Sequence, residues 1–158
     1  MKVQIVLADV GRPSGVGTLN LLNAGWTFTA GPPQPAQAVA VFLEVPWDRL
    51  NHRVDVVIEL LDEDDHIADL QTPTGPLPAR VEQQVIAGNV PGAPNGTPGT
   101  TTILLEFPLG SLQLPAGHRY RWRVTVEGER NDAWEAGFWV QQPQPRPPTL
   151  GGMLLDPS

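Results

Sequence analysis

The densest group of side chains that could bind a cation is the acidic segment at residues 62–65 (Asp-Glu-Asp-Asp), which His66 and Asp69 follow. Calcium takes about six to eight oxygen ligands, usually from alternating positions of a loop that also holds a glycine turn and a distal bidentate acid. This segment has neither the glycine nor the distal glutamate. Because aspartate favours turn conformations, the sequence favours a charged hairpin turn here over a calcium site.

Other residue types that support catalysis are scattered along the chain. The three histidines, at positions 52, 66 and 118, lack the short spacing of a zinc site. His52 lies next to Asn51, but no nucleophile is near it in sequence, so a structural role in its loop is favoured. None of the three serines lies in a nucleophile elbow. We therefore expect no catalytic residues, no metal and no cofactor, and the chain is not predicted to be an enzyme.

Trp47 is the aromatic residue that most suggests a binding role, because Pro46 and Asp48 on either side of it indicate a turn. A tryptophan in such a turn can plug the end of a β-sandwich or stand exposed as an interface anchor. Since tryptophan is usually mostly buried, the plug is the favoured interpretation. Trp47 nevertheless remains a candidate partner-binding residue, together with the Pro/Gly-rich loop at residues 88–99, which is long enough to be functional.

The segment at residues 119–127 (RYRWRVTVE) alternates strictly between apolar and polar side chains. Residues 120, 122, 124 and 126 are predicted to face a core, while three arginines at positions 119, 121 and 123 face the other way. The arginine row could bind an acidic partner or phosphate. A solvated face, paired with carboxylates of the neighbouring strand, is the favoured interpretation.

Short alternating or β-branched segments, separated by Pro/Gly clusters, form the predicted strands that position the candidate side chains described above. We expect nine strands at residues 2–8, 19–29, 38–45, 54–61, 67–70, 80–87, 101–107, 119–127 and 137–141. No long window has a helical period. This spacing predicts an all-β, antiparallel β-sandwich, immunoglobulin-like or jelly-roll-like, over residues 1–141. The approach of residues 112–117 to Tyr120 also resembles a tyrosine corner.

Composition narrows the class of partner. The 158-residue chain has no cysteine and a net charge of −7, which argues against nucleic-acid or anionic-membrane binding. The short N-terminal apolar run ends at Asp9, so we expect no signal peptide and a cytoplasmic origin, although the protein could end in a virion. Protein partners, in a homo-oligomer or capsid-type assembly, are expected instead.

Residues 142–158 form a Pro-rich C-terminal tail with apolar residues beyond its prolines. Such an end becomes ordered when a partner holds it. The prolines would act as a semi-rigid polyproline II spacer and the apolar residues as an anchor for a groove. The predicted partner-binding residues of this tail are Pro143, Pro145, Pro147, Pro148, Leu150, Met153, Leu154 and Leu155.

The order of several short motifs resembles an uncharacterised small-domain family of actinobacteria and their phages, over about residues 2–141. The motifs are LNLLNAGW at 19–26, VPWD at 45–48, NH at 51–52, LDED at 61–64 and YRWR at 120–123. The family has no assigned activity or catalytic residues. Its phage members imply a virion role for this chain.

Two hypotheses about function follow. The first is a virion accessory protein, such as a capsid decoration or minor structural protein, whose sandwich body and tail bind neighbouring subunits. The alternative is a cellular β-sandwich module that binds a small ligand or peptide through the Trp47 loop and the loop at residues 88–99.

Overall fold

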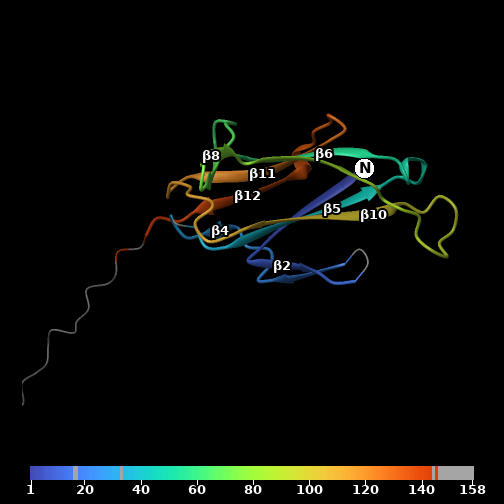
Figure 1. Cartoon of the computed structure of the whole chain (residues 1–158), viewed down its shortest axis with the longest axis horizontal. Coiled ribbons are helices and arrows are strands. Elements are labelled where there is room, and N and C mark those ends of the chain that lie inside the picture. The colour runs from blue at the N-terminus through green and yellow to red at the C-terminus, as the bar shows by residue number, and fades with distance from the viewer. Residues whose placement is uncertain (16–17, 33, 144, 146–158) are drawn as a thin grey trace, which may run out of the picture.

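The protein is an all-β sandwich of two facing sheets (Figure 1). The computed structural model describes residues 1–15, 18–32, 34–143 and 145. One sheet has three strands in the order β1-β5-β10, with bounds β1 (Lys2–Ala8), β5 (Gln37–Val45) and β10 (Gly99–Phe107). The other has the order β4-β12-β11-β6-β9, with bounds β4 (Phe28–Thr29), β12 (Glu135–Val140), β11 (Arg119–Val126), β6 (Val54–Leu61) and β9 (Arg80–Val85). The predicted fold class is confirmed.

The core lies between the two sheets and follows the alternation of the strands. On β11, Tyr120, Trp122, Val124 and Val126 are all buried, as the period-2 pattern predicts. Trp122 stacks on Phe107 of the opposite sheet with ring centroids 5.2 Å apart. Such an aromatic pair joins the two sheets across the middle of the core.

A hairpin formed by β2 (Val10–Pro13) and β3 (Leu19–Leu22) adds a third layer outside the three-stranded sheet (Figure 1). A Cβ added to Gly11 would lie 2.5 Å from Leu104 Cδ1, so the hairpin backbone presses directly on β10. This cover explains why the first half of β5 is buried on both faces, with Ala38 and Ala40 as inaccessible as Val39 and Val41. The sequence of a strand that is covered on both faces is typically a continuous run of apolar residues.

Two strand predictions are wrong. The expected strand at residues 19–29 is divided into β3 and β4, because Asn23 and Gly25 between them have φ of 50° and 87°. This left-handed backbone cannot continue a strand. The expected strand at residues 67–70 and the loop after it are instead a hairpin of β7 (Asp69–Thr72) and β8 (Gly75–Pro78).

Other details also differ from the prediction. The pairing of β12 with β4 is parallel, with Trp139 opposite Phe28 and Val140 opposite Thr29. Tyr120 is buried, but its hydroxyl makes no hydrogen bond to another described residue, so the predicted tyrosine corner is absent from this part of the chain. The loop that enters β11 is held by the buried Gln34 instead, whose amide donates to Leu114 O (2.8 Å) and accepts from Leu114 N (2.7 Å).

Two short 3-10 helices complete the described elements, η1 (Trp47–Arg49) and η2 (Asp132–Trp134). No helix within residues 1–15, 18–32, 34–143 and 145 has the length and apolar character needed to cross a bilayer.

Candidate functional site

A groove at one end of the sandwich brings together two segments that are far apart in sequence. One wall is the turn at η1, directly after β5, and the other is the loop at residues 86–98, which joins β9 to β10. The groove has a volume of about 530 Å³. Its lining includes Trp47, Leu50, Asn89, Val90, Pro94 and Asn95. A cavity of this size, on loops carried by a rigid scaffold, has the dimensions of an ordinary ligand site.

Trp47 stands in the open wall of this groove, with 63% of its surface exposed. The favoured interpretation from sequence, that Trp47 plugs the end of the sandwich, is therefore wrong. Leu50 takes the buried position instead, with only 8% of its surface exposed. The side chain that follows the turn closes the core, which leaves the indole of Trp47 free for an interface.

Two hydrogen bonds order the base of the groove, one between its walls and one within the Trp47 turn. The backbone N–H of Asn51 donates to Ala87 O at 2.8 Å, which ties the Trp47 turn to the base of the long loop. The ring of His52 donates from Nδ1 to Leu50 O at 2.9 Å, so the predicted structural role of His52 is confirmed. One main-chain hydrogen bond thus joins the two walls and a side-chain bond fixes the Trp47 turn, so a ligand would not have to organise the groove first.

The long loop has its own internal order. Ala93 N donates to Val90 O (3.1 Å) and Thr97 N donates to Pro94 O (3.2 Å), so two successive turns shape the loop. The hydroxyl of Thr97 also donates to Pro94 O at 2.7 Å. These turns present Val90 and Pro94 toward the groove on a compact loop, as in other functional surface loops.

Gly99 is predicted to be essential for the shape of the groove. A Cβ at this position would lie 2.6 Å from Leu50 Cδ2 and 2.7 Å from Gly88 O. Because the second contact is with backbone, Gly99→Ala should lower the free energy of unfolding by about 1–3 kcal/mol in a urea titration. Gly88→Ala is the matched control, since its Cβ would meet nothing closer than 4.0 Å. Equal stability of the two variants would contradict this account of the loop.

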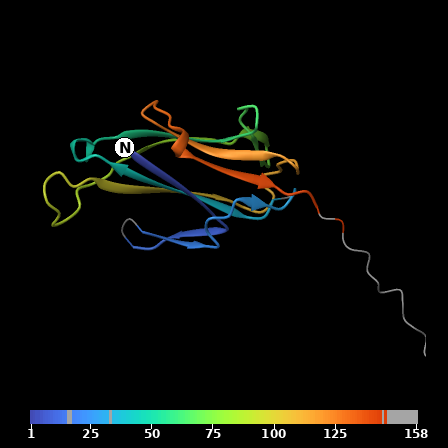
Figure 2. The ribbon, with the colours of Figure 1, turned by 180° about the vertical axis from the view of Figure 1, so that it is seen from behind.

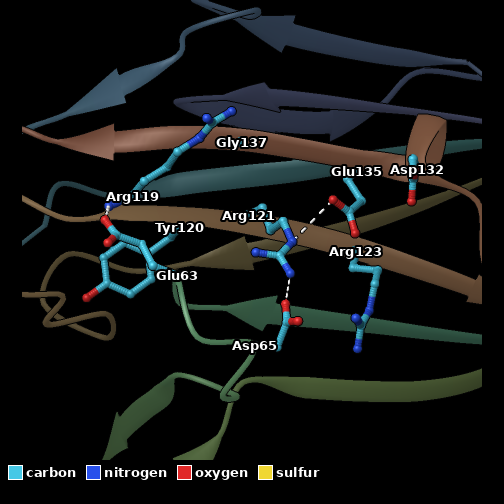
Figure 3. A pocket seen from close by; sticks show the side chains of 9 residues that line it. All are labelled: Glu63, Asp65, Arg119, Tyr120, Arg121, Arg123, Asp132, Glu135 and Gly137. Atoms are coloured by element: carbon cyan, nitrogen blue, oxygen red, sulfur yellow. Dashed lines mark hydrogen bonds and ion pairs between the residues drawn. The ribbon is translucent and has the colours of Figure 1, made fainter.

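A second, more polar hollow of about 680 Å³ lies over the outer face of the five-stranded sheet (Figure 3). The arginine row of β11 crosses it, with carboxylates from the flanking segments around it. Arg121 pairs with Asp65 and, through Nε, with Glu135 at 3.2 Å. Arg123 pairs with the buried Glu59 at 3.0 Å. The favoured interpretation, a face whose arginines pair with neighbouring carboxylates, is confirmed for these two residues.

Arg119 differs from the other two arginines of the row. Its backbone N–H donates to Glu63 at 2.7 Å, while its guanidinium lies against Gly137 and has no ion pair within the described part of the chain (Figure 3). Two exposed aromatic residues lie in register with it, Trp139 and Phe28, at 51% and 57% exposure. Two of the three arginines of the row are paired with carboxylates, so most of the positive charge on this face is neutralised.

The acidic segment forms the charged hairpin turn that its sequence predicts. Asp62 N donates to His66 O at 2.9 Å, and Asp65 adopts the left-handed conformation with φ of 64°. Asp62 Oδ1 accepts the backbone N–H groups of Asp64 and His66, each at 2.9 Å. Ligand atoms of Asp62, Asp64 and His66 lie within 4.8 Å of one another, but Asp62 already serves the turn, and exposed acidic groups cluster in this way without an ion.

Asp62 should make this turn sensitive to pH. Burial raises the pKa of Asp62, but the hydrogen bonds from the His66 and Asp64 N–H groups, together with the positive charges of His66 and Arg121, hold that pKa below its usual value. A lowered pKa in the folded state means that the ionised carboxylate stabilises the fold. That contribution is complete above the unfolded-state pKa, near 4, and is lost as pH falls through the folded value.

In consequence, Asp62→Ala should cost about 1 kcal/mol of unfolding free energy at pH 7, followed by thermal or urea unfolding. Asp62→Asn keeps the oxygen acceptor and should cost less. Its stability should also depend less on pH between pH 5 and 2 than that of the unsubstituted protein. An alanine variant as stable as the asparagine variant would refute the role of this side chain.

The structure places the other predicted partner-binding residues as follows. Pro143 and Pro145 are exposed and lie outside any strand. The remaining predicted tail residues lie outside the described residues: Pro147, Pro148, Leu150, Met153, Leu154 and Leu155. Of the predicted set, only Trp47 is therefore part of a described groove.

Fold and site together define a β-sandwich protein with a loop-built groove at one end. Comparison of the sequence with protein-family models gives no match, and comparison with curated proteins gives none either. The resemblance to a family of actinobacteria and their phages stays a prediction.

Proposed function

We propose that this protein is a binding module that acts without a chemical step and captures a short peptide segment of a partner protein in the Trp47 groove. The observation that carries the proposal is the exposure of Trp47, 63%, on the wall of a groove that a distant loop completes. Burying an exposed tryptophan is among the most favourable contributions to a protein interface. A large apolar side chain that is exposed to solvent on an ordered turn is well suited to such an interface.

The chemistry of the lining favours a peptide over a charged small molecule. The groove contains no charged side chain, and its polar groups include the amides of Asn89 and Asn95. Side-chain amides both donate and accept hydrogen bonds, as a peptide backbone requires. Apolar contact with Trp47 and Val90 would supply affinity, and the amides would fix the direction of the bound segment.

The proposal can be tested with an array of short synthetic peptides of random sequence, probed with the labelled protein. Trp47→Ala should weaken binding of the selected peptides by at least about 30-fold, the loss expected for an interface hot spot. Trp139→Ala is the matched control, because Trp139 is also about half exposed but does not line the groove. An array in which no selected peptide depends on Trp47, or in which the Trp139 variant loses binding equally, would reject the proposal.

The wider role predicted from sequence, an accessory subunit of a phage particle, remains a second hypothesis. It is supported by the motif resemblance and by the tail composition alone. A groove that binds peptides would serve equally well in a particle or in a cell, so the two hypotheses share the same molecular activity.

A further inference from the structure

The Trp47 groove has the surface chemistry of a site for polyproline II segments. Its exposed apolar residues are Trp47, Val90 at 46% exposure and the nearby Pro94. Proline-rich segments bind aromatic-lined grooves, because the polyproline II helix is already formed and loses little entropy on docking. The carbonyl groups of such a helix have no internal partner. Here the indole N–H of Trp47 and the amides of Asn89 and Asn95 could donate to them.

The chain itself carries a segment of this kind. Residues 142–149 read QPQPRPPT, with four prolines in eight residues. The single charge in this segment is Arg146, whereas the whole protein carries a net charge of −7. A cationic segment is attracted to an acidic protein, so the approach of this segment to a copy of the same chain is electrostatically favoured.

The first residues of this segment, 142 and 143, follow β12 at the end of the sandwich opposite the groove (Figures 1 and 2). Its start packs near Gly31, where an added Cβ would lie 3.3 Å from Gln141 O and 4.0 Å from Pro143 Cδ. Gly31 lies before β5 in the chain, and Trp47 lies just after β5 ends. The length of β5 therefore separates the exit of the segment from the groove.

The length of β5, compared with that of the Pro-rich segment as a polyproline II helix, shows which copy of the groove the prolines can reach. From Gln37 to Val45, β5 advances eight residues, or about 26 Å at about 3.3 Å per residue. From Pro143 to Pro148 a polyproline II helix advances five residues, or about 16 Å at about 3.1 Å per residue. A polyproline II helix of this length is too short to span the distance back to the groove of its own copy. A groove on a second copy is the remaining place where these prolines can dock.

We propose that residues 142–149 of one copy dock in the Trp47 groove of a second copy. This proposal rests on the proposed function, since it names the peptide that the groove takes. The contact is heterologous, with a different surface on each copy, so its repetition would join copies head to tail into rings or filaments. Each copy would then offer one groove and one Pro-rich segment.

Complementation between two full-length variants tests the proposal. Trp47→Ala keeps the Pro-rich segment and loses the groove, whereas Pro145→Ser/Pro147→Ser/Pro148→Ser keeps the groove and loses the segment. Measured by light scattering, each variant alone should keep the monomer mass of 17.1 kDa at protein concentrations up to about 1 mM. A dissociation constant of about 1 mM marks a weak specific complex. An equimolar mixture should form a species of twice that mass and none larger, because it contains only one intact pair of surfaces. The unsubstituted protein should grow beyond that mass with concentration.

Two results would overturn the proposal: a mixture that stays monomeric, or a triple-serine variant that self-associates as the unsubstituted protein does. The peptide array separates this failure from that of the proposed function. If the mixture is monomeric while the array still selects Trp47-dependent peptides, the groove binds another partner and only the head-to-tail contact is wrong. If the array also selects none, both proposals fail.

Discussion

Replacing Trp122 by alanine should lower the free energy of unfolding by about 3–5 kcal/mol, whereas replacing Trp47 by alanine should change it by less than about 0.5 kcal/mol. Trp122 has 1% of its surface exposed and stacks on Phe107 between the two sheets. Its removal would leave a cavity that the surrounding strands can only partly fill. Trp47 projects into solvent, so its removal leaves no cavity.

Urea unfolding of the two variants measures this contrast directly. The Trp47 variant should keep both the midpoint and the slope of the unsubstituted protein, because the slope follows the surface exposed on unfolding. A loss of more than about 1 kcal/mol in the Trp47 variant would show that this side chain supports the core, and the assignment of Trp47 to an interface would then be wrong.

The second large effect is expected at Glu59, the buried carboxylate that two arginines share. Glu59 is 3% exposed and accepts from Arg80 at 2.8 Å and from Arg123 at 3.0 Å. Glu59→Gln should cost about 2–4 kcal/mol, because the Arg123 side chain is only 15% exposed and would lose its carboxylate in a poorly solvated place. Arg80 is more exposed and keeps Glu82, which limits the loss.

Glu82→Gln is the matched control for this prediction. Glu82 pairs with the same Arg80, but its side chain is 64% exposed. Exposed ion pairs contribute about 0–1 kcal/mol, so this variant should remain within that range of the unsubstituted protein. Equal losses for the two glutamate variants in urea unfolding would contradict the view that burial decides the strength of this network.

The strands whose sequence alternates were predictable, because one face of each lies on the core. The clearest case is β11, where burial follows the period-2 pattern from Arg119 to Val124, and only Thr125 departs from it by being buried on the outer face. The division of residues 19–29 was harder to predict, because single residues with left-handed backbone, Asn23 and Gly25, end the strand. The strand β8 contains two prolines and lies outside the nine predicted strands, yet prolines are tolerated in a two-stranded hairpin at the surface.

The two walls of the groove could be named from sequence, but their exposure could not. The turn at Trp47 and the loop at residues 88–99 carry visible Pro/Gly signals. Whether Trp47 or a neighbour fills the core depends on three-dimensional packing, and Leu50 takes that place. The role of Gln34, which holds the loop before β11 from 80 residues away, has no local signal either.

The central claim, that the groove around Trp47 is the binding site, can be tested most directly by fluorine NMR. Incorporation of 5-fluorotryptophan labels all five tryptophans at once, and Trp47→Phe assigns the resonance of Trp47. Titration with a peptide selected from the array should shift the Trp47 resonance and leave the resonances of the buried Trp122 and the exposed Trp139 in place. A shift at Trp139 with none at Trp47 would contradict the claim and move the binding site to the outer face of the five-stranded sheet.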